Sequence, residues 1–381
     1  MFKNLVNTVN KKANLLKIGK IMEELKDLRQ KINQVDKEMA RLFEERMSVV
    51  KEIAFIKRQK GISIYDKGRE DEIIEKNSQF IADETIREYY VNFLKDNMKV
   101  SKSYQSRVLE GMKVAYSGTE GAFAHLATIK LFPYAKAVSY PNFQSAYDAV
   151  VNGDCEVAVL PVENSYNGEV GQVMDLAFFG SLYINGTYEM PITQDLLGVK
   201  GATIADIKKV LSHPQALGQC ANYIKEKGFS QTEYENTALA AKYIAEKGDK
   251  SLGAIASAEA AEIFGLSVLE RNVNASRNNT TKFAIFSRVK HKRDTSEKNV
   301  NTALTFTVKN EAGALARAIE VIGKHGFNMR CLRSRPVKDL LWQYYFYIEA
   351  EGNVDTPDGK VMLDELKEFC DKVKTLGTFT H

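Results

Sequence analysis

Positively charged side chains interrupt an apolar stripe in the first sixth of the chain. Apolar residues recur there at a 3,4 spacing from Leu25 to Leu42, and the next position of the pattern holds Arg46. Arg29 flanks the same stripe, and Lys57 follows Arg46 by about three helical turns. Arginine and lysine are rarely buried without a partner. The pattern therefore allows either a buried ion pair that sets helix register or a pocket between helices for a ligand with several negative charges. Candidate ion-pair partners for Arg46 are Asp36, Glu45 and Glu52.

Short polar motifs recur through the middle of the chain. They are SGTEGAF at 117–123, PVENS at 161–165, SHPQAL at 212–217 and NNTTKF at 278–283. Three of them follow predicted strands, and loops beyond strand ends in an open α/β sheet meet in a crevice where helix N-termini favour anions. Taken alone, SGTEG is a turn and Ser212 could cap a helix that has proline in its first turn. Each motif by itself is weak support for a ligand site.

The elements that carry the charged stripe are helices. Residues 23–60 contain no glycine or proline, which predicts one helix longer than ~50 Å that ends at Gly61. Such a helix is too extended for a small domain to cover, so we expect its stripe to contact a second chain. Two further helices are expected near 67–79 and 83–109, giving an all-helical module to about residue 108.

The motifs of the middle region lie between alternating strand and helix patterns. Strands are expected at 113–116, 157–160, 210–212, 252–256 and 283–287. Helices are expected at 121–131, 143–151, 215–227, 238–247 and 259–264. This alternation predicts an α/β module with a largely parallel sheet. The charge-rich stretch 290–299 is the expected linker to the C-terminal region.

The C-terminal region predicts a small α+β unit. Strands are expected at 302–308, 328–333 and 342–349, with a possible last strand at 378–381. Helices are expected at 314–325 and 359–375. This βαββαβ order is typical of a ferredoxin-like unit.

Composition excludes several other classes of protein. The 381 residues carry a net charge of +4, but residues 1–21 hold five lysines and no acid, which leaves −1 on the rest of the chain. A nucleic-acid partner is therefore not expected. The sequence has no apolar run of membrane-spanning length and no secretory signal pattern, which predicts a cytoplasmic protein. Four scattered cysteines and five histidines without ligand spacing indicate neither disulfides nor a metal.

Residues 1–21 are a leader that could be an upstream start, a vector remnant or a flexible arm.

The helical region resembles the AroQ-type chorismate mutase family. The resemblance rests on the run LRQKINQVDKEMARLFEE at 28–45 and on polar positions of matching type and spacing: Arg29, Arg46, Lys57, Asp66, Arg69, Glu70, Ser101 and Gln105. It implies a three-helix intertwined homodimer in which arginines bind the substrate carboxylates and Arg29 reaches the partner's site. Lys57 and Gln105 would donate to the ether oxygen, which is the charge stabilisation that a pericyclic rearrangement needs. Without the other six residues, we would interpret Ser101 and Gln105 as polar residues on an exposed helix face.

The four motifs of the middle region resemble those of prephenate dehydratases, together with NFQSAYDAV near Asn142 and SAEAAEIFGL at 257–266. The resemblance implies two α/β subdomains with the site between them and Thr281 as the catalytic residue, aided by Ser212 and His213. It implies substrate-binding roles for Ser117, Gly121, Ala122, Glu163, Asn164, Ser165, Thr280, Lys282 and Phe283. The family's Thr-Arg-Phe is Thr-Lys-Phe here, so the single ammonium group of Lys282 replaces a guanidinium that can bind a carboxylate through two N–H groups. Either the substrate carboxylate is held more loosely, or Arg277 contributes to binding it.

The C-terminal region resembles the ACT regulatory domain that follows the dehydratase in the bifunctional family. The resemblance implies that L-phenylalanine binds at Gly313, Ala314, Leu315, Asn328, Ser334, Arg335 and Pro336. Gly313 by itself is a helix-start residue, and Trp342, Tyr344 and Phe346 are a strand face. The family's Glu-Ser-Arg-Pro begins here with Arg333, which reverses one charge.

The three modules follow the order of bifunctional chorismate mutase/prephenate dehydratases. We expect a leader at 1–21, a mutase domain at 22–108, a dehydratase domain at 111–289, a linker at 290–299 and an ACT domain at 300–381. The expected substrates are chorismate and prephenate, without a cofactor or metal, in a homodimer or tetramer that L-phenylalanine inhibits. The alternatives are a non-catalytic sensor of small anions or amino acids, and an enzyme with one working site.

Overall fold

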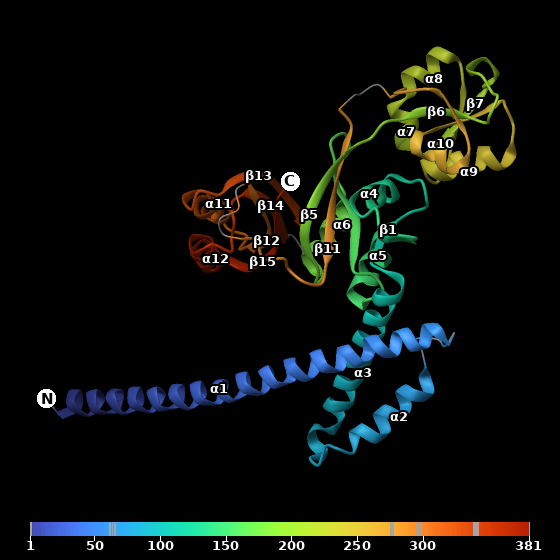
Figure 1. The fold of residues 1–381 in the computed structure, drawn as a ribbon. Coiled ribbons are helices and arrows are strands. Elements are labelled where there is room, and N and C mark those ends of the chain that lie inside the picture. The colour runs from blue at the N-terminus through green and yellow to red at the C-terminus, as the bar shows by residue number, and fades with distance from the viewer. Residues whose placement is uncertain are drawn as a thin grey trace. The chain divides into compact units, whose positions relative to one another are not determined.

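In the computed structural model of the chain, the described residues are 2–60, 62, 64, 66–274, 278–294, 297, 299–337 and 343–380, with the backbone alone described for 2–21. Gly61, Arg277 and Trp342, which the sequence analysis named, lie outside this set. The chain divides into two compact units, residues 1–110 and 111–381 (Figure 1). Among the described residues, no helix combines the length and apolar character needed to cross a bilayer.

The first unit consists of three helices, as the sequence predicts. They are α1 (Phe2–Gln59), α2 (Lys67–Ser78) and α3 (Glu84–Glu110). α3 packs against both of the others. Val50 and Ala54 of α1 are buried with Leu94 and Met98 of α3. The side chain of Asp66 caps α2 by accepting a hydrogen bond of 3.0 Å from the backbone N–H of Arg69.

The first helix begins earlier than the sequence pattern predicts. Its backbone is helical from Phe2, whereas the apolar pattern placed its start near Met22. Residues 2–21 contain no proline and one glycine, so backbone hydrogen bonding continues through the leader.

The second unit begins with a six-stranded sheet in the order β2-β1-β3-β11-β5, with β4 beside β3. Its strands are β1 (Lys113–Ser117), β2 (Lys136–Tyr140), β3 (Val157–Asn164), β4 (Gly168–Glu169), β5 (Tyr183–Pro191) and β11 (Thr280–Ser287). Its helices are α4 (Phe123–Leu131), α5 (Phe143–Asn152) and α6 (Gly171–Phe179).

A five-stranded sheet in the order β10-β6-β9-β7-β8 is inserted between β5 and β11. Its strands are β6 (Asp195–Gly198), β7 (Lys209–Ser212), β8 (Ser230–Glu233), β9 (Leu252–Ala256) and β10 (Ser267–Glu270). Its helices are the short η1 (Ile204–Asp206), α7 (Pro214–Gln219), α8 (Ala221–Lys227), α9 (Thr237–Lys247) and α10 (Ala258–Phe264). Figure 1 shows β5 and β11 running side by side toward this second sheet.

The prediction of a largely parallel sheet is wrong for both sheets. β1 pairs in parallel with β2 and β3, but β11 is antiparallel to β3 and to β5. In the second sheet, β7 pairs in parallel with β8 and β9, whereas β6 is antiparallel to β9 and β10. The reason is that β11 returns from the inserted sheet and enters the first sheet from the opposite end. Strand propensity contains no information about that direction.

The C-terminal residues form a four-stranded antiparallel sheet in the order β13-β14-β12-β15. Its elements are β12 (Val300–Val308), α11 (Ala314–Lys324), β13 (Asn328–Pro336), β14 (Tyr344–Glu351), α12 (Pro357–Phe369) and β15 (Cys370–Thr380). The element order is the predicted one. The predicted end of the last helix at Thr375 is wrong, because the chain pairs with β12 from Cys370 onward and leaves the helix at Phe369.

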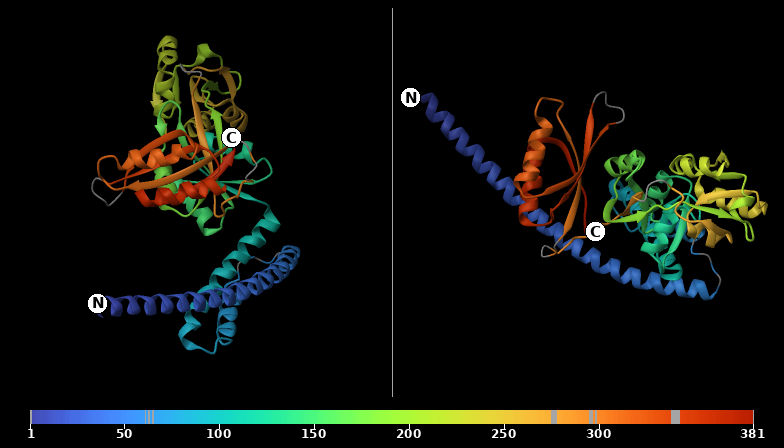
Figure 2. Two further views of the ribbon diagram at one scale, coloured as in Figure 1. Left: turned by 90° about the vertical axis from the view of Figure 1, so that its left-hand side faces the viewer. Right: turned by 90° about the horizontal axis from the view of Figure 1, so that it is seen from above.

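The two faces of the C-terminal sheet have different neighbours. α11 and α12 cover one face, where Leu304 and Ile348 are buried with both helices (Figure 2). The other face contributes Tyr347 and Phe379 to a core shared with the first sheet, including Phe286 of β11. The C-terminal sheet is therefore packed onto the first sheet through a continuous apolar core.

A glycine allows the closest part of this packing. A Cβ added at Gly377 of β15 would overlap the backbone carbonyl oxygen of Ile184 in β5. Both groups belong to paired strands, so neither can move aside without breaking ladder hydrogen bonds.

We expect the Gly377→Ala variant to lose about 1–3 kcal/mol of unfolding free energy, because overpacking a well-packed core typically costs this much. Urea denaturation of the full chain followed by circular dichroism measures the loss. Gly323→Ala in α11 is the matched control. Apart from the backbone of its own helix, no atom of the described residues lies within 4 Å of the added Cβ there, and a gain of up to about 1 kcal/mol is expected. Equal stability of the two variants would contradict the close packing of β15 on β5.

Candidate active sites

The helical unit brings Arg46 of the predicted mutase set into contact with Ser101. Arg46 of α1 donates a hydrogen bond to the hydroxyl of Ser101 in α3, and that hydroxyl donates to the carbonyl of Asn97 at 2.7 Å. Burial lowers the pKa of the Arg46 guanidinium. Glu45, one of the acids proposed as its partner, instead binds Arg41 at 3.1 Å. Among the described residues, the contacts of Arg46 thus favour a polar pocket over a buried ion pair.

Buried amides lie next to this arginine. Ser101 and Gln105 are both buried on α3, which excludes the exposed helix face as their explanation. The side-chain oxygens of Gln105 and Asn97 are buried and have no hydrogen-bond partner within the described part of the chain. Buried polar atoms without partners are costly, so this position is built to receive a polar group.

The remaining mutase residues lie around the loop between α1 and α2 or farther along α1. Lys57 donates to the carbonyl of Ile64 at 3.0 Å. Glu70 accepts from Lys102 at 2.8 Å, and Arg69 pairs with Glu72 at 2.6 Å. Arg29 is exposed. It lies about 25 Å along the helix from Arg46, since each residue adds 1.5 Å. Within one chain, Arg29 and Arg46 therefore do not reach the same pocket.

The second unit contains a cavity of about 620 Å³ between its first two sheets. Its lining includes Ala122, Asn164 and Thr281 from the first sheet and its loops, and His213 and Gln219 from the inserted sheet. Four predicted residues from four separate motifs thus line one cavity. Their convergence follows from the strand order, because β3 and β11 are neighbours and α7 follows β7.

The hydroxyl of Thr281 is held by a network of amides. Asn164 pairs with Thr281 in the register of β3 and β11, and its Nδ2 donates to Thr281 Oγ1 at 2.9 Å. Asn164 Oδ1 accepts backbone N–H groups of Tyr166 and Asn167 at 3.0 and 2.9 Å, which fixes the orientation of the amide. Asn164 also donates to Asn279 Oδ1 at 2.8 Å.

Asn279 and Gln219 were not predicted as site residues. Asn279 Nδ2 donates to Gln219 Oε1 at 3.1 Å, so the amide network joins β3 and β11 to α7 of the inserted sheet. Asn279 belongs to the NNTTKF motif, which was a usable signal, and Gln219 lies one helical turn after Gln215 of SHPQAL.

Other predicted residues support the lining without facing the cavity. Ser165 accepts from the backbone of Thr280 at 2.9 Å and donates to the carbonyl of Asn278 at 2.8 Å, tying PVENS to NNTTKF. Ser117 ends β1, and Gly121 has a φ of +82°, which favours glycine in the loop before Ala122.

Ser212 is placed differently from the expectation. Its hydroxyl is fully buried and donates to the carbonyl of Ile255 at 2.5 Å, so it holds β7 to β9. The helix cap proposed for Ser212 is supplied by its neighbour: His213 Nδ1 accepts from the backbone of Gln215 at 3.2 Å, with Pro214 in the first turn.

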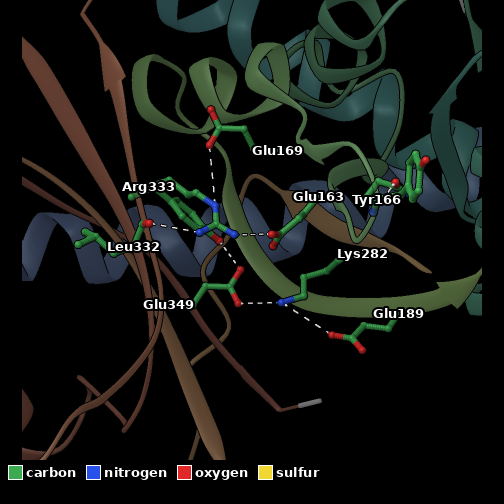
Figure 3. Close-up of polar contacts among 10 residues, drawn as sticks. Glu163, Tyr166, Glu169, Glu189, Lys282, Leu332, Arg333 and Glu349 are labelled. Carbon is green, nitrogen blue, oxygen red and sulfur yellow. Dashed lines mark hydrogen bonds and ion pairs between the residues drawn. The ribbon is translucent and has the colours of Figure 1, made fainter. Parts of the chain in front are cut away.

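Glu163 and Lys282 point toward the C-terminal sheet (Figure 3), and neither is among the residues that line the cavity. Arg333 of β13 forms an ion pair with Glu163. Lys282 Nζ lies 3.1 Å from Glu349 of β14 and 3.8 Å from Glu189. Burial lowers the pKa of Lys282, but these carboxylates outweigh it and hold the pKa above its usual value. These contacts do not support substrate-binding roles for Glu163 and Lys282. Phe283 is buried in the core.

The predicted effector residues divide between two places. Gly313 precedes α11 with a φ of +79°, and Leu315 lines a cavity of about 380 Å³ with Tyr344 and Phe346. Ala314 is buried, and Asn328 donates to Glu351 at 2.7 Å. Ser334, Arg335 and Pro336 lie on β13. Arg335 contacts Glu169 and Asp175 of the first-sheet region instead of this cavity.

Comparison with known proteins assigns a class to both units. Residues 28–106 match the family "Chorismate mutase type II", and residues 114–291 match "Prephenate dehydratase". The bifunctional chorismate mutase/prephenate dehydratase of Aquifex aeolicus is 33% identical over 94% of this chain and 98% of its own length. The chain belongs to the bifunctional chorismate mutase/prephenate dehydratase family.

Two further proteins resemble the second unit. Arogenate dehydratase 2 of Petunia hybrida is 34% identical over 70% of this chain and 71% of its own length. The prephenate dehydratase of Arthrobacter aurescens, solved in complex with L-Phe, is 24% identical, has a TM-score of 0.65 and covers 71% of this chain and 90% of that chain. The latter similarity supports the fold of the part of the chain that it covers.

Proposed function

We propose that this chain catalyses two successive reactions: the rearrangement of chorismate to prephenate in the helical unit, and the conversion of prephenate to phenylpyruvate in the α/β cavity. Membership of the bifunctional family supports both activities. The observation that carries the second reaction is the convergence of Thr281, Asn164 and His213 on one cavity between two sheets. We assign residues 22–108 to the mutase, 111–289 to the dehydratase and 300–381 to a regulatory domain, with a linker at 290–299.

The mutase reaction needs no proton transfer or nucleophile. The ether C–O bond breaks as the new C–C bond forms, and negative charge grows on the ether oxygen. Arg46 binds a carboxylate in this proposal, while Lys57 Nζ and the side-chain amide N–H of Gln105 donate to the ether oxygen. Asp66, Arg69, Glu70 and Ser101 complete the binding set.

A second copy of the chain completes the mutase site. Arg29 lies too far along α1 from Arg46 to bind the same ligand within one chain. The apolar stripe of α1 is between 40% and 62% exposed in the single chain. Its members are Leu25, Leu28, Ile32, Val35, Met39, Leu42, Val49, Ile53 and Ile56. A stripe of this size requires a covering partner, and a homodimer that pairs α1 with its copy covers the stripe and brings Arg29 to the partner's Arg46 site.

The dehydratase reaction requires a proton donor at the departing hydroxyl. The C–C bond to the ring carboxylate breaks, CO₂ leaves, and its electron pair completes the aromatic ring as the C–O bond breaks. The hydroxyl takes up a proton and leaves as water. Because Asn164 donates to Thr281 Oγ1, the threonine hydroxyl proton is free to point at the departing group. His213 contributes from the opposite side of the cavity.

The C-terminal sheet is the proposed ACT domain, and L-phenylalanine is its proposed effector. Its strand order and βαββαβ succession support the assignment, as does the Arthrobacter aurescens enzyme solved with L-Phe. The cavity beside Gly313 and Leu315 is the proposed binding position. Arg333 is turned toward Glu163 of the dehydratase, so the reversed charge at this position is used in an ion pair between modules.

We expect substitutions to separate the two activities. Thr281→Ala should reduce phenylpyruvate formation by at least ~10²-fold and leave chorismate consumption unchanged, because the proton donor is lost. Lys57→Ala should have the reverse effect. Both activities are followed by absorbance in the same purified sample, so that each variant is the control for the other. Arogenate is assayed as a second substrate in parallel with prephenate. Equal loss of both activities in either variant would refute two separate sites. Absence of both products from the wild-type chain would favour a non-catalytic sensor.

A mixing experiment tests whether Arg29 acts across the dimer. Arg29→Ala and Lys57→Ala chains should each lack mutase activity. If each site takes Arg29 from one chain and Lys57 from the other, mixed dimers regain one intact site. Subunit exchange between equal amounts should then restore about a quarter of wild-type activity, by random pairing of the chains. Mixing without recovery, although exchange is verified by native mass spectrometry, would place Arg29 in its own chain's site.

Calorimetry tests the proposed effector. L-phenylalanine titrated into the full chain should release a measurable heat of binding and lower the rate of phenylpyruvate formation. Gly313→Ala should weaken binding, since alanine is strained at a φ of +79°. A chain that forms phenylpyruvate but gives no heat with L-phenylalanine would overturn the effector assignment and leave the catalytic one standing.

A further inference from the structure

One wall of the dehydratase cavity is a short continuous segment. Residues 167–172, which comprise β4 and the start of α6, all line the cavity that contains Thr281. β4 is joined to β3 by only two residue pairs, Glu163 with Glu169 and Asn164 with Gly168. A two-residue strand at a sheet edge has little stability of its own. Other contacts must therefore hold this wall in place.

Arg335 of the C-terminal sheet supplies such contacts at the start of α6. Its guanidinium lies 3.0 and 3.3 Å from the two carboxylate oxygens of Asp175 and 2.9 Å from Glu169. A Cβ added at Gly171 would overlap the same guanidinium, so the arginine lies directly against the wall backbone. Asp175 is buried and also accepts from the hydroxyl of Tyr345 at 2.9 Å. A bidentate pair of this kind fixes geometry as well as charge.

Lys374 of β15 supplies contacts at the other end of the same helix. Its Nζ donates to the carbonyls of Ala177 and Gly180 at 2.6 and 2.5 Å. Carbonyls at the end of a helix such as α6 have no backbone partner within the helix. Burial and the nearby Lys372 lower the pKa of Lys374 to about 8. Between the two ends, Phe178 stacks on Tyr345 with ring centroids 4.1 Å apart.

We propose that Arg335 and Lys374 are positioning residues for the dehydratase reaction. By holding α6 at both ends, they fix the cavity wall of residues 167–172 from behind, and the C-terminal sheet is thereby a structural part of the dehydratase site. This inference rests on the proposed function of the cavity. It also gives Arg335 a role other than effector binding, because its donors are directed to Asp175 and Glu169.

Arg333 acts at the base of the same wall. Arg333 forms an ion pair with Glu163, the residue immediately before Asn164, and its Nε is 4.0 Å from Glu169 (Figure 3). Two arginines from one strand thus approach β3 and β4 from the side opposite to the substrate.

The test compares three variants of the full chain: Arg335→Met, Lys374→Met and, as the matched control, Arg330→Met. Arg330 lies on the same strand as Arg335 but pairs with Glu351 within the C-terminal sheet. We expect Arg335→Met and Lys374→Met each to lower kcat/KM for phenylpyruvate formation at least tenfold. Arg330→Met should leave it within twofold of wild type. Mutase activity of the same samples should be unchanged in all three, since its residues lie in the first unit.

Hydrogen–deuterium exchange separates positioning from general destabilisation. Peptides covering residues 167–180 should exchange faster in Arg335→Met and Lys374→Met, while peptides covering residues 237–256 of the inserted sheet should be unchanged. Arg335→Lys, which retains the charge but loses the fork, should recover part of the activity. Folded variants with wild-type kcat/KM and wild-type exchange over residues 167–180 would overturn the inference. A wild-type chain that forms no phenylpyruvate would overturn the proposed function instead.

Discussion

The register of β11 against β3 is the constraint on which both faces of the dehydratase module depend. In that register, Thr281 pairs with Asn164 and Lys282 with Glu163. Because side chains alternate between the faces of a strand, Thr281 turns to the cavity and Lys282 to the C-terminal sheet. A slip of one residue would turn each side chain to the opposite face, directing the ammonium group of Lys282 to the cavity face and the hydroxyl of Thr281 to the face of the C-terminal sheet. One pairing therefore determines the chemistry of the cavity and the attachment of the next module together.

The interface between the C-terminal sheet and the first sheet has an apolar centre, and ion pairs form a charged margin around it. Tyr347 and Phe379 enter the core of the first sheet, and burial of such side chains provides the larger part of the stabilisation. The ion pairs around them are half-buried, and such pairs contribute more to orientation than to stability. The two positions at which this chain departs from the family motifs, Lys282 and Arg333, both lie in this margin. Each forms an ion pair with a carboxylate of the opposite module.

Local patterns in the sequence predicted much of the secondary structure and the meeting of the motifs, but not the contacts between modules. The strand at Leu252–Ala256 was predicted residue for residue, and the cavity contains Thr281, Asn164 and His213 as expected. Strand direction was not predictable, because pairing of β11 depends on a return path of some ninety residues. Ser212 and Lys282 were assigned to the site by motif membership alone, whereas burial and strand alternation direct their side chains elsewhere. Arg335 could not be recognised as a neighbour of Asp175, since nothing local joins residues 160 positions apart.

The inserted sheet is joined to the first sheet by two chain crossings that are hydrogen-bonded to each other. Ile192 on the outgoing crossing donates to the carbonyl of Asn279 on the returning one at 2.8 Å, and Val273 donates back to Gln194 at 2.8 Å. Side-chain contacts add to these two crossings, because Thr119 lies 3.5 Å from Asn236 and Ile263 of α10 packs against the core of the first sheet. Asn279 sits on the returning crossing and binds Asn164, which in turn binds Thr281. The position of the inserted sheet and the hydrogen bond to the Thr281 hydroxyl are thus linked through a single asparagine, so the proposed proton donor is held by both sheets at once.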